Sequence, residues 1–146
     1  MNIILKLCFV LSVVLALACG VRANADSRVT DDLGRTIALA HPARRIVSLA
    51  PHITELLFDV GAGQWIVGTA AYSDYPAAAK DIPRVGDSMR LDLERIVALR
   101  PDLLVVWLHA NRRRQLEPLL KLGIPVFYDR PHALEDIARS IVALGR

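Results

Sequence analysis

Cysteine is nearly absent from this sequence, and its two cysteines, Cys8 and Cys19, both lie among the first twenty residues. The rest of the chain therefore carries no disulfide framework from which a fold could be read. A strong excess of positive charge is absent too. Lysine and arginine number 18 against 15 acidic residues, and two of the basic residues, Lys6 and Arg22, fall within a predicted leader. Near-neutrality beyond the leader argues against a nucleic-acid partner.

The motifs of several enzyme classes are also missing. No Gly-x-Ser-x-Gly elbow and no phosphate-cradling glycine loop occurs. Gly61-Ala62-Gly63 precedes a predicted strand instead of following one, so we interpret it as the end of a helix and not as a dinucleotide loop. We therefore expect no catalytic residue, no bound cofactor and no enzymatic activity.

The four histidines are scattered, and no pair has the spacing of metal ligands on a helix. They are His41, His52, His109 and His132. We predict no metal site. His52 and His109 each follow a predicted strand, however, so a histidine–metal contact at one edge of a sheet is the alternative.

The N-terminus has the pattern of an export signal. Lys6 supplies a positive charge, residues 7–18 are apolar, and residues 23–25 are the small-x-small sequence that a signal peptidase accepts. A dozen apolar residues are too few to cross a bilayer, which takes roughly 20. We expect a signal peptide over residues 1–25, cleavage after Ala25 and a periplasmic protein. A lipoprotein anchored at Cys19, where the preceding residues resemble a lipobox, is the alternative.

Beyond the leader, strand-like runs alternate with segments of helical period. Turn residues at 31–34 predict a β-hairpin over Val29–Leu39. Further strands are expected at 46–49, 65–68, 103–106 and 124–128. Helices are expected after the loop Ala50-Pro51-His52, ending before Gly61, and at 93–99, 111–122 and 134–144. This alternation predicts an α/β fold with a Rossmann-like, mainly parallel sheet and helices on both faces. The expected inward residues of the helices at 93–99 and 111–122 are Leu93, Ile96, Val97, Leu99, Leu116, Leu119 and Leu120. The first helix carries Leu56, Leu57 and Val60, and in the last one Leu134, Ile137, Ala138, Ile141 and Leu144 recur at helical spacing.

Several of the chain's few aromatic residues follow the predicted strands. In an open parallel sheet, ligands bind outside the carboxyl ends of the strands. The candidate ligand-binding residues there are Pro51, His52, Tyr72, Tyr75 and Trp107. Large flat side chains on a rigid edge suit a bulky, partly apolar ligand. The alternative is that these aromatics only cover strand ends.

Two charged features lie at predicted helix starts. Arg112-Arg113-Arg114 opposes the helix dipole, which favours negative charge there; it is either a solvated surface or a contact for an anionic group. Glu94 starts another helix, where a carboxylate is favourable without any further role.

Several stretches resemble the ABC-importer binding proteins for iron-siderophore complexes and cobalamin. The likeness to the whole family lies in Val29–Arg35 and in Arg45–Pro51 with Thr54-Glu55. Tyr72–Pro76 and Leu93–Leu103 narrow it to the branch that binds cobalamin. The likeness covers nearly all of the chain beyond the leader.

This resemblance implies a solute-binding component that captures cobalamin or a related corrinoid and delivers it to an ABC permease at the inner membrane. A ferric siderophore or haem is the alternative ligand, and a small Rossmann-type enzyme is the alternative of another class. The family has two Rossmann-like lobes joined by one long helix, with the ligand clamped between them. Residues 26–146 are therefore expected to be the N-terminal lobe of a monomer, with the second lobe absent, and to bind ligand weakly alone.

The resemblance also assigns roles to residues. Tyr72 and Trp107 match aromatic residues that contact the corrin, and Glu94 matches a surface glutamate that docks into an arginine-lined pocket of the permease. The cobalamin branch has a tryptophan six places before that glutamate, and this chain has Ser88 there.

Overall fold

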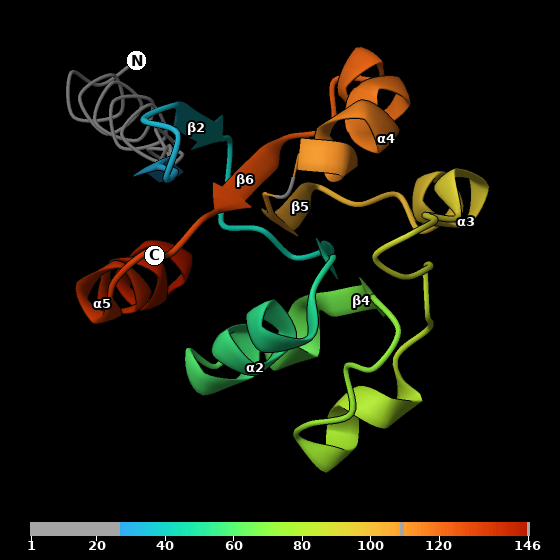
Figure 1. Ribbon diagram of the computed structural model, residues 1–146, viewed down its shortest axis with the longest axis horizontal. Coiled ribbons are helices and arrows are strands. Elements are labelled where there is room, and N and C mark those ends of the chain that lie inside the picture. The colour runs from blue at the N-terminus through green and yellow to red at the C-terminus, as the bar shows by residue number, and fades with distance from the viewer. Residues whose placement is uncertain (1–26, 109, 146) are drawn as a thin grey trace, which may run out of the picture.

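Four parallel strands form the centre of the fold in the computed structural model (Figure 1). Their order across the sheet is β4 (Ile66–Thr69), β3 (Ile46–Ser48), β5 (Leu103–Trp107) and β6 (Val126–Asp129). The structure describes residues 27–108 and 110–145, so the predicted leader, its cleavage site and Cys19 lie outside the described residues. The predicted α/β class with a parallel sheet is confirmed.

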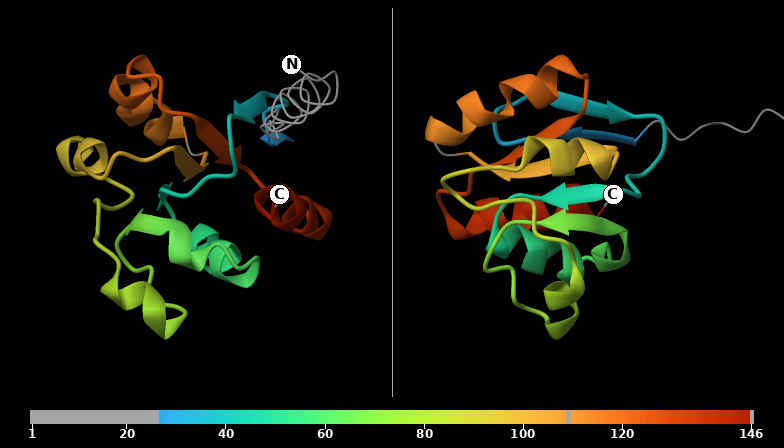
Figure 2. Two further views of the ribbon diagram at one scale, coloured as in Figure 1. Left: turned by 180° about the vertical axis from the view of Figure 1, so that it is seen from behind. Right: turned by 90° about the vertical axis from the view of Figure 1, so that its right-hand side faces the viewer.

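Helices cover both faces of the sheet because the strands are apolar on both sides. One face packs against α3 (Leu93–Ala98) and α4 (Ala110–Lys121), and the other against α2 (Pro51–Asp59) and α5 (Leu134–Leu144). Figures 1 and 2 show these two helical layers. Successive side chains of a strand point to opposite faces of the sheet, so the core has two parts. Val106 and Tyr128 face α3 and α4, whereas Val105 and Phe127 face α2 and α5.

The chain reverses its direction of travel across the sheet between β3 and β5. From β3 it passes through α2 and a 3-10 turn at Gly63–Trp65 to the edge strand β4. It then returns through a 3-10 turn at Ala77–Asp81 and α3 to β5, and continues through α4 to β6. The point between β3 and β5 is therefore a topological switch point, where open α/β sheets form their binding crevices.

The predicted hairpin is present and docks on β6. Its strands are β1 (Ser27–Thr30) and β2 (Thr36–Leu39), which pair antiparallel. Asp31 is buried in the turn and accepts hydrogen bonds from the backbone N–H groups of Leu33 and Arg35 and from the Arg35 guanidinium. That guanidinium also donates to the Val126 carbonyl at 2.8 Å and stacks on Tyr128. Asp31 thus organises both the turn and its attachment to the sheet.

Several predicted inward residues are exposed. Val97 and Leu120 lie on the outer sides of α3 and α4, because Ile96, Leu116 and Leu119 already fill the space against the sheet. On α5, four of the residues that recur at helical spacing face solvent: Leu134, Ile137, Ala138 and Ile141. The helical period was read correctly there, but it does not show whether a partner covers the apolar face.

The boundary before α2 was also misplaced. Pro51 and His52 belong to the first turn of α2 and not to a loop before it, since proline is well suited to the first helical position. Within the described residues, none of the helices combines the length and the apolar character needed to cross a bilayer.

Candidate functional site

The carboxyl ends of the four parallel strands meet at one edge of the sheet, which we call the C-terminal edge. His52 follows β3, Tyr72 and Tyr75 follow β4, and Trp107 ends β5. Neighbouring strands lie about 4.8 Å apart, so the ends of β4 and β5, with β3 between them, are roughly 10 Å apart. The predicted site residues therefore share one edge. Their role in binding stays a prediction.

His52 and Trp107 meet at the switch point between β3 and β5. Their rings pack edge to face with centroids 5.1 Å apart. Trp107 continues the side of β5 that carries Val105, so its indole lies toward the α2 layer from which His52 projects. Pro51 at the first position of α2 fixes the backbone from which His52 extends. Trp107 stays 37% exposed at this edge.

The loop after β4 presents two tyrosines and buries the residue between them. Tyr72 is 81% and Tyr75 67% exposed, whereas Ser73 is buried. The Ser73 hydroxyl accepts a hydrogen bond from Thr54 at 3.2 Å, and Thr54 in turn bonds Ser48 at 2.8 Å. This hydroxyl chain fastens the loop to α2 and β3.

A second anchor holds the same loop from its other side. Arg84 donates to the Asp74 carboxylate at 3.0 Å and to the Ala79 carbonyl at 3.2 Å. Its guanidinium also bonds the hydroxyl of Thr69, the last residue of β4. With Ser73 and Asp74 tied down, Tyr72 and Tyr75 project from a fixed backbone.

Tyr72 has an unusual backbone conformation. Its φ is +66°, in the left-handed region that non-glycine residues seldom occupy. Such a conformation costs on the order of 1 kcal/mol and persists only where the surroundings enforce it. The next peptide bonds include a cis bond between Tyr75 and Pro76.

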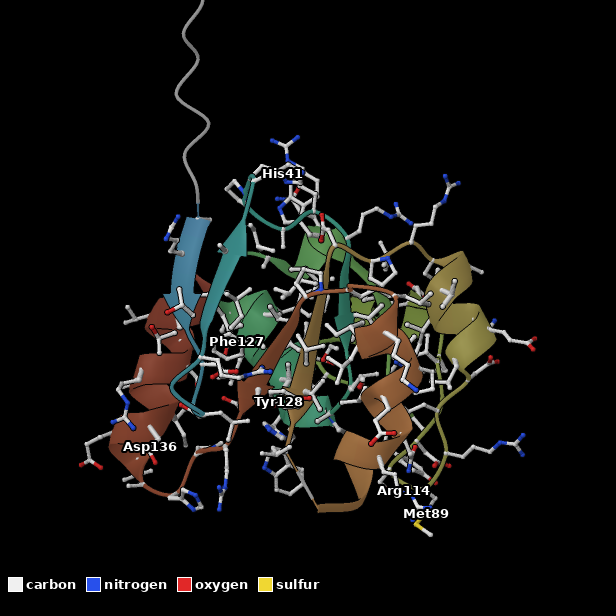
Figure 3. All side chains as sticks on the ribbon, turned by 90° about the horizontal axis from the view of Figure 1, so that it is seen from above. His41, Met89, Arg114, Phe127, Tyr128 and Asp136 are labelled. Atoms are coloured by element: carbon white, nitrogen blue, oxygen red, sulfur yellow. The ribbon has the colours of Figure 1, made fainter. Side chains whose placement is uncertain are left out.

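Met89 is an exposed apolar side chain that the sequence analysis missed. Its side chain is 82% exposed and lies next to the exposed Ser88 in a short turn. The Asp87 carboxylate holds this turn by accepting hydrogen bonds from the backbone N–H groups of Met89 and Arg90. Figure 3 places Met89 beside Arg114 at the start of α4 and on the side of the molecule opposite His41. His41 precedes β3, so Met89 lies on the side of the C-terminal edge. The sign of this residue in the sequence was an isolated methionine within a short polar turn.

Asp129 is a second residue that was missed. It ends β6 and is fully buried, with its side chain on the α2 and α5 side of the sheet. One carboxylate oxygen accepts from the Ser140 hydroxyl at 2.5 Å, and the other lies 3.4 Å from Nε2 of His52. The sign of Asp129 in the sequence was an acidic residue directly after an apolar, strand-like run.

Glu94 lies at the second position of α3, exposed to solvent, just after the capping residue Asp92. Because α3 runs antiparallel to the strands, its first turn is on the side of the C-terminal edge. The side chains of His109, Arg112 and Arg113 lie outside those that the structure describes, and Arg114 is exposed. Across residues 27–108 and 110–145, no group of three or more potential metal-ligating side chains occurs.

Comparisons with known proteins extend the picture. A family model described as periplasmic binding protein matches residues 46–146. The vitamin B12-binding protein of Vibrio campbellii (strain ATCC BAA-1116) is 43% identical over 105 residues, which are 72% of this chain and 38% of that protein. The crystal structure of the periplasmic vitamin B12 binding protein BtuF of Vibrio cholerae superposes with a TM-score of 0.68 at 39% identity, covering 71% of this chain and 41% of that one.

A periplasmic heme binding protein from Pseudomonas aeruginosa also superposes, with a TM-score of 0.61 at 26% identity, covering 70% of this chain and 39% of that one. The chain thus spans about two fifths of the length of these relatives. Because the family model matches well over half of its residues, the chain belongs to the periplasmic binding protein family.

Proposed function

We propose that this protein is a solute-binding component of an ABC importer and that it captures cobalamin or a related corrinoid in the periplasm. The observation that carries the proposal is the set of exposed rings at the C-terminal edge. They belong to Tyr72, Tyr75 and Trp107, with His52 packed against the last. The names of the relatives from the two Vibrio species support the same ligand class.

Exposed aromatic rings suit a corrin because the macrocycle is broad, partly apolar and nearly flat. Each ring offers a large apolar face with few internal rotations to freeze on binding. The anchors at Ser73 and Asp74 fix the tyrosine loop before the ligand arrives, so little ordering cost is left to be met on association. Binding by contact area leaves the covalent structure of the ligand unchanged, in keeping with a transport role.

Glu94 is the residue that we propose for docking on the permease. It is exposed, and it lies beside the C-terminal edge without belonging to the ring set. A carboxylate there can pair with a guanidinium on the membrane protein. The test is Glu94→Gln, which keeps the shape and removes the charge. It should leave cyanocobalamin binding unchanged and lower uptake when the gene is the sole source of the binding component.

Haem or a ferric siderophore is the second candidate ligand. The heme binding protein of Pseudomonas aeruginosa shares the fold at 26% identity, and the cobalamin branch's tryptophan is replaced by Ser88. Arg114 at the same side of the molecule would suit an anionic chelate. The binding experiment therefore compares both classes.

Equilibrium dialysis of the full chain against cyanocobalamin, dicyanocobinamide, haemin and a ferric hydroxamate tests the proposal. We expect both corrinoids to bind with dissociation constants in the micromolar range or weaker, since the rings of the C-terminal edge contact a ligand from one side. The double variant Tyr72→Ala, Trp107→Ala should abolish binding. Val142→Ala removes an exposed apolar group from the far end of α5 and is the matched control. Equal corrinoid binding by the double variant would refute the proposed site, and preferential haemin binding would reassign the ligand.

A further inference from the structure

Asp129 is a fully buried carboxylate with incomplete hydrogen bonding. One oxygen is satisfied by Ser140, but Oδ2 has no hydrogen-bond partner in the part of the chain that the structure describes. Burial of an unpaired carboxylate oxygen is costly, so a buried acid normally has a compensating partner. Nε2 of His52 lies 3.4 Å away and is itself buried without a partner in the same described region.

The two unpaired atoms therefore face each other. A carboxylate opposite Nε2 favours the tautomer that carries its proton on that nitrogen, because only this form can donate toward Oδ2. The neutral ring then keeps its lone pair on Nδ1. Carboxylate groups orient metal-binding imidazoles in this way and fix which nitrogen stays free.

The rest of the His52 ring is accessible from the C-terminal edge. Its side chain is 41% exposed although Nε2 is buried, and Nδ1 makes no hydrogen bond to any residue within 27–108 and 110–145. Trp107 packs against the ring, edge to face, from the β5 side. His52 is thus an imidazole fixed on two sides, with a free lone pair at the switch point.

From this geometry we infer that His52 ligates the metal of the bound chelate through Nδ1, and that Asp129 positions it. The inference rests on the proposed function, because it requires a metal chelate lying on the ring set. A flat macrocycle packed against these rings presents an axial position of its metal to the wall. A neutral imidazole nitrogen is a suitable ligand for such a position. His52 would thereby select chelates whose axial site is open or exchangeable over those whose site is blocked.

The test compares aquocobalamin, whose axial water is exchangeable, with cyanocobalamin, whose cyanide is not. Binding of each to the full chain is measured by equilibrium dialysis, and the visible absorption bands of the bound corrinoid are recorded. With the unaltered protein, we expect the bands of aquocobalamin to move as they do when imidazole replaces its water, and those of cyanocobalamin to stay in place. His52→Ala should abolish the band shift and lower the ratio of aquocobalamin to cyanocobalamin affinity about tenfold.

Two further variants separate ligation from structure. Asp129→Asn should reduce the affinity ratio in the same direction while cyanocobalamin still binds, because a loosened imidazole loses its fixed tautomer. His41→Ala, which removes an exposed histidine from the opposite edge, should change neither the spectra nor the ratio. Binding of aquocobalamin with unchanged bands would overturn the inference and leave the proposed function standing. Failure of both corrinoids to bind in dialysis would overturn both.

Discussion

Substitutions at Tyr72 separate an effect on ligand affinity from an effect on folding stability. Its side chain is 81% exposed, and a buried tyrosine covers roughly 200 Å². If a corrin covers one face of the ring, about 80 Å² leaves water, which at about 25 cal/mol per Å² contributes ~2 kcal/mol. Tyr72→Ala should therefore raise the dissociation constant of cyanocobalamin about 30-fold, since 1.4 kcal/mol corresponds to a factor of ten.

Tyr72→Gly should lose the same affinity but fold more stably than Tyr72→Ala. Alanine keeps a side chain at a φ of +66°, whereas glycine adopts this conformation without strain. The difference should be about 1 kcal/mol in the free energy of unfolding, measured by urea titration followed by circular dichroism. The reasoning would be refuted if both variants bound cyanocobalamin like the parent, or if glycine proved the less stable of the two.

Three more predictions concern the supports of the fold and the site. Asp31→Ala should lower the unfolding free energy in urea by about 2–4 kcal/mol, because it leaves buried N–H groups and the Arg35 guanidinium without an acceptor; a loss below 0.5 kcal/mol would contradict this. Arg84→Gln should release Asp74 and raise the dissociation constant of cyanocobalamin about fivefold in dialysis; an unchanged affinity would show that the loop needs no such anchor. The backbone N–H groups of His132 and Ala133 hold the pKa of Asp136 below its ordinary value, with Arg139 adding to the effect. Asp136→Ala should accordingly lower the free energy of unfolding at neutral pH, measured by urea titration. The difference in unfolding free energy between the variant and the parent should disappear as the pH falls below about 4 and through the lowered pKa. A difference that persists at low pH would exclude the ionic contribution.

Strand and helix alternation was readable from the sequence because buried parallel strands are continuous apolar runs. The segments around Val105 and Phe127 show this clearly. The sharing of one edge by Tyr72 and Trp107 followed from the same reading, since parallel strands place their carboxyl ends together. The likeness to a known family then predicted which of these exposed rings would contact a ligand.

Other features depend on packing and could not be read from a one-dimensional pattern. Asp129 looks like the start of a loop in the sequence, and only the fold shows it buried between Ser140 and His52. The apolar period of α5 gives no sign that Leu134 faces solvent, because periodicity identifies a face and not what covers it. Met89 escaped notice because a single apolar residue in a turn has no period at all.

Amide hydrogen exchange of the full chain with and without saturating cyanocobalamin tests the central claim most directly. If the ligand lies on the C-terminal edge, protection should rise in residues 70–76, in the turn at 86–90 and around Trp107, whereas residues 40–45 and 61–65 at the opposite edge should exchange as before. Protection confined to the opposite edge, or to the outer face of α5, would contradict the account.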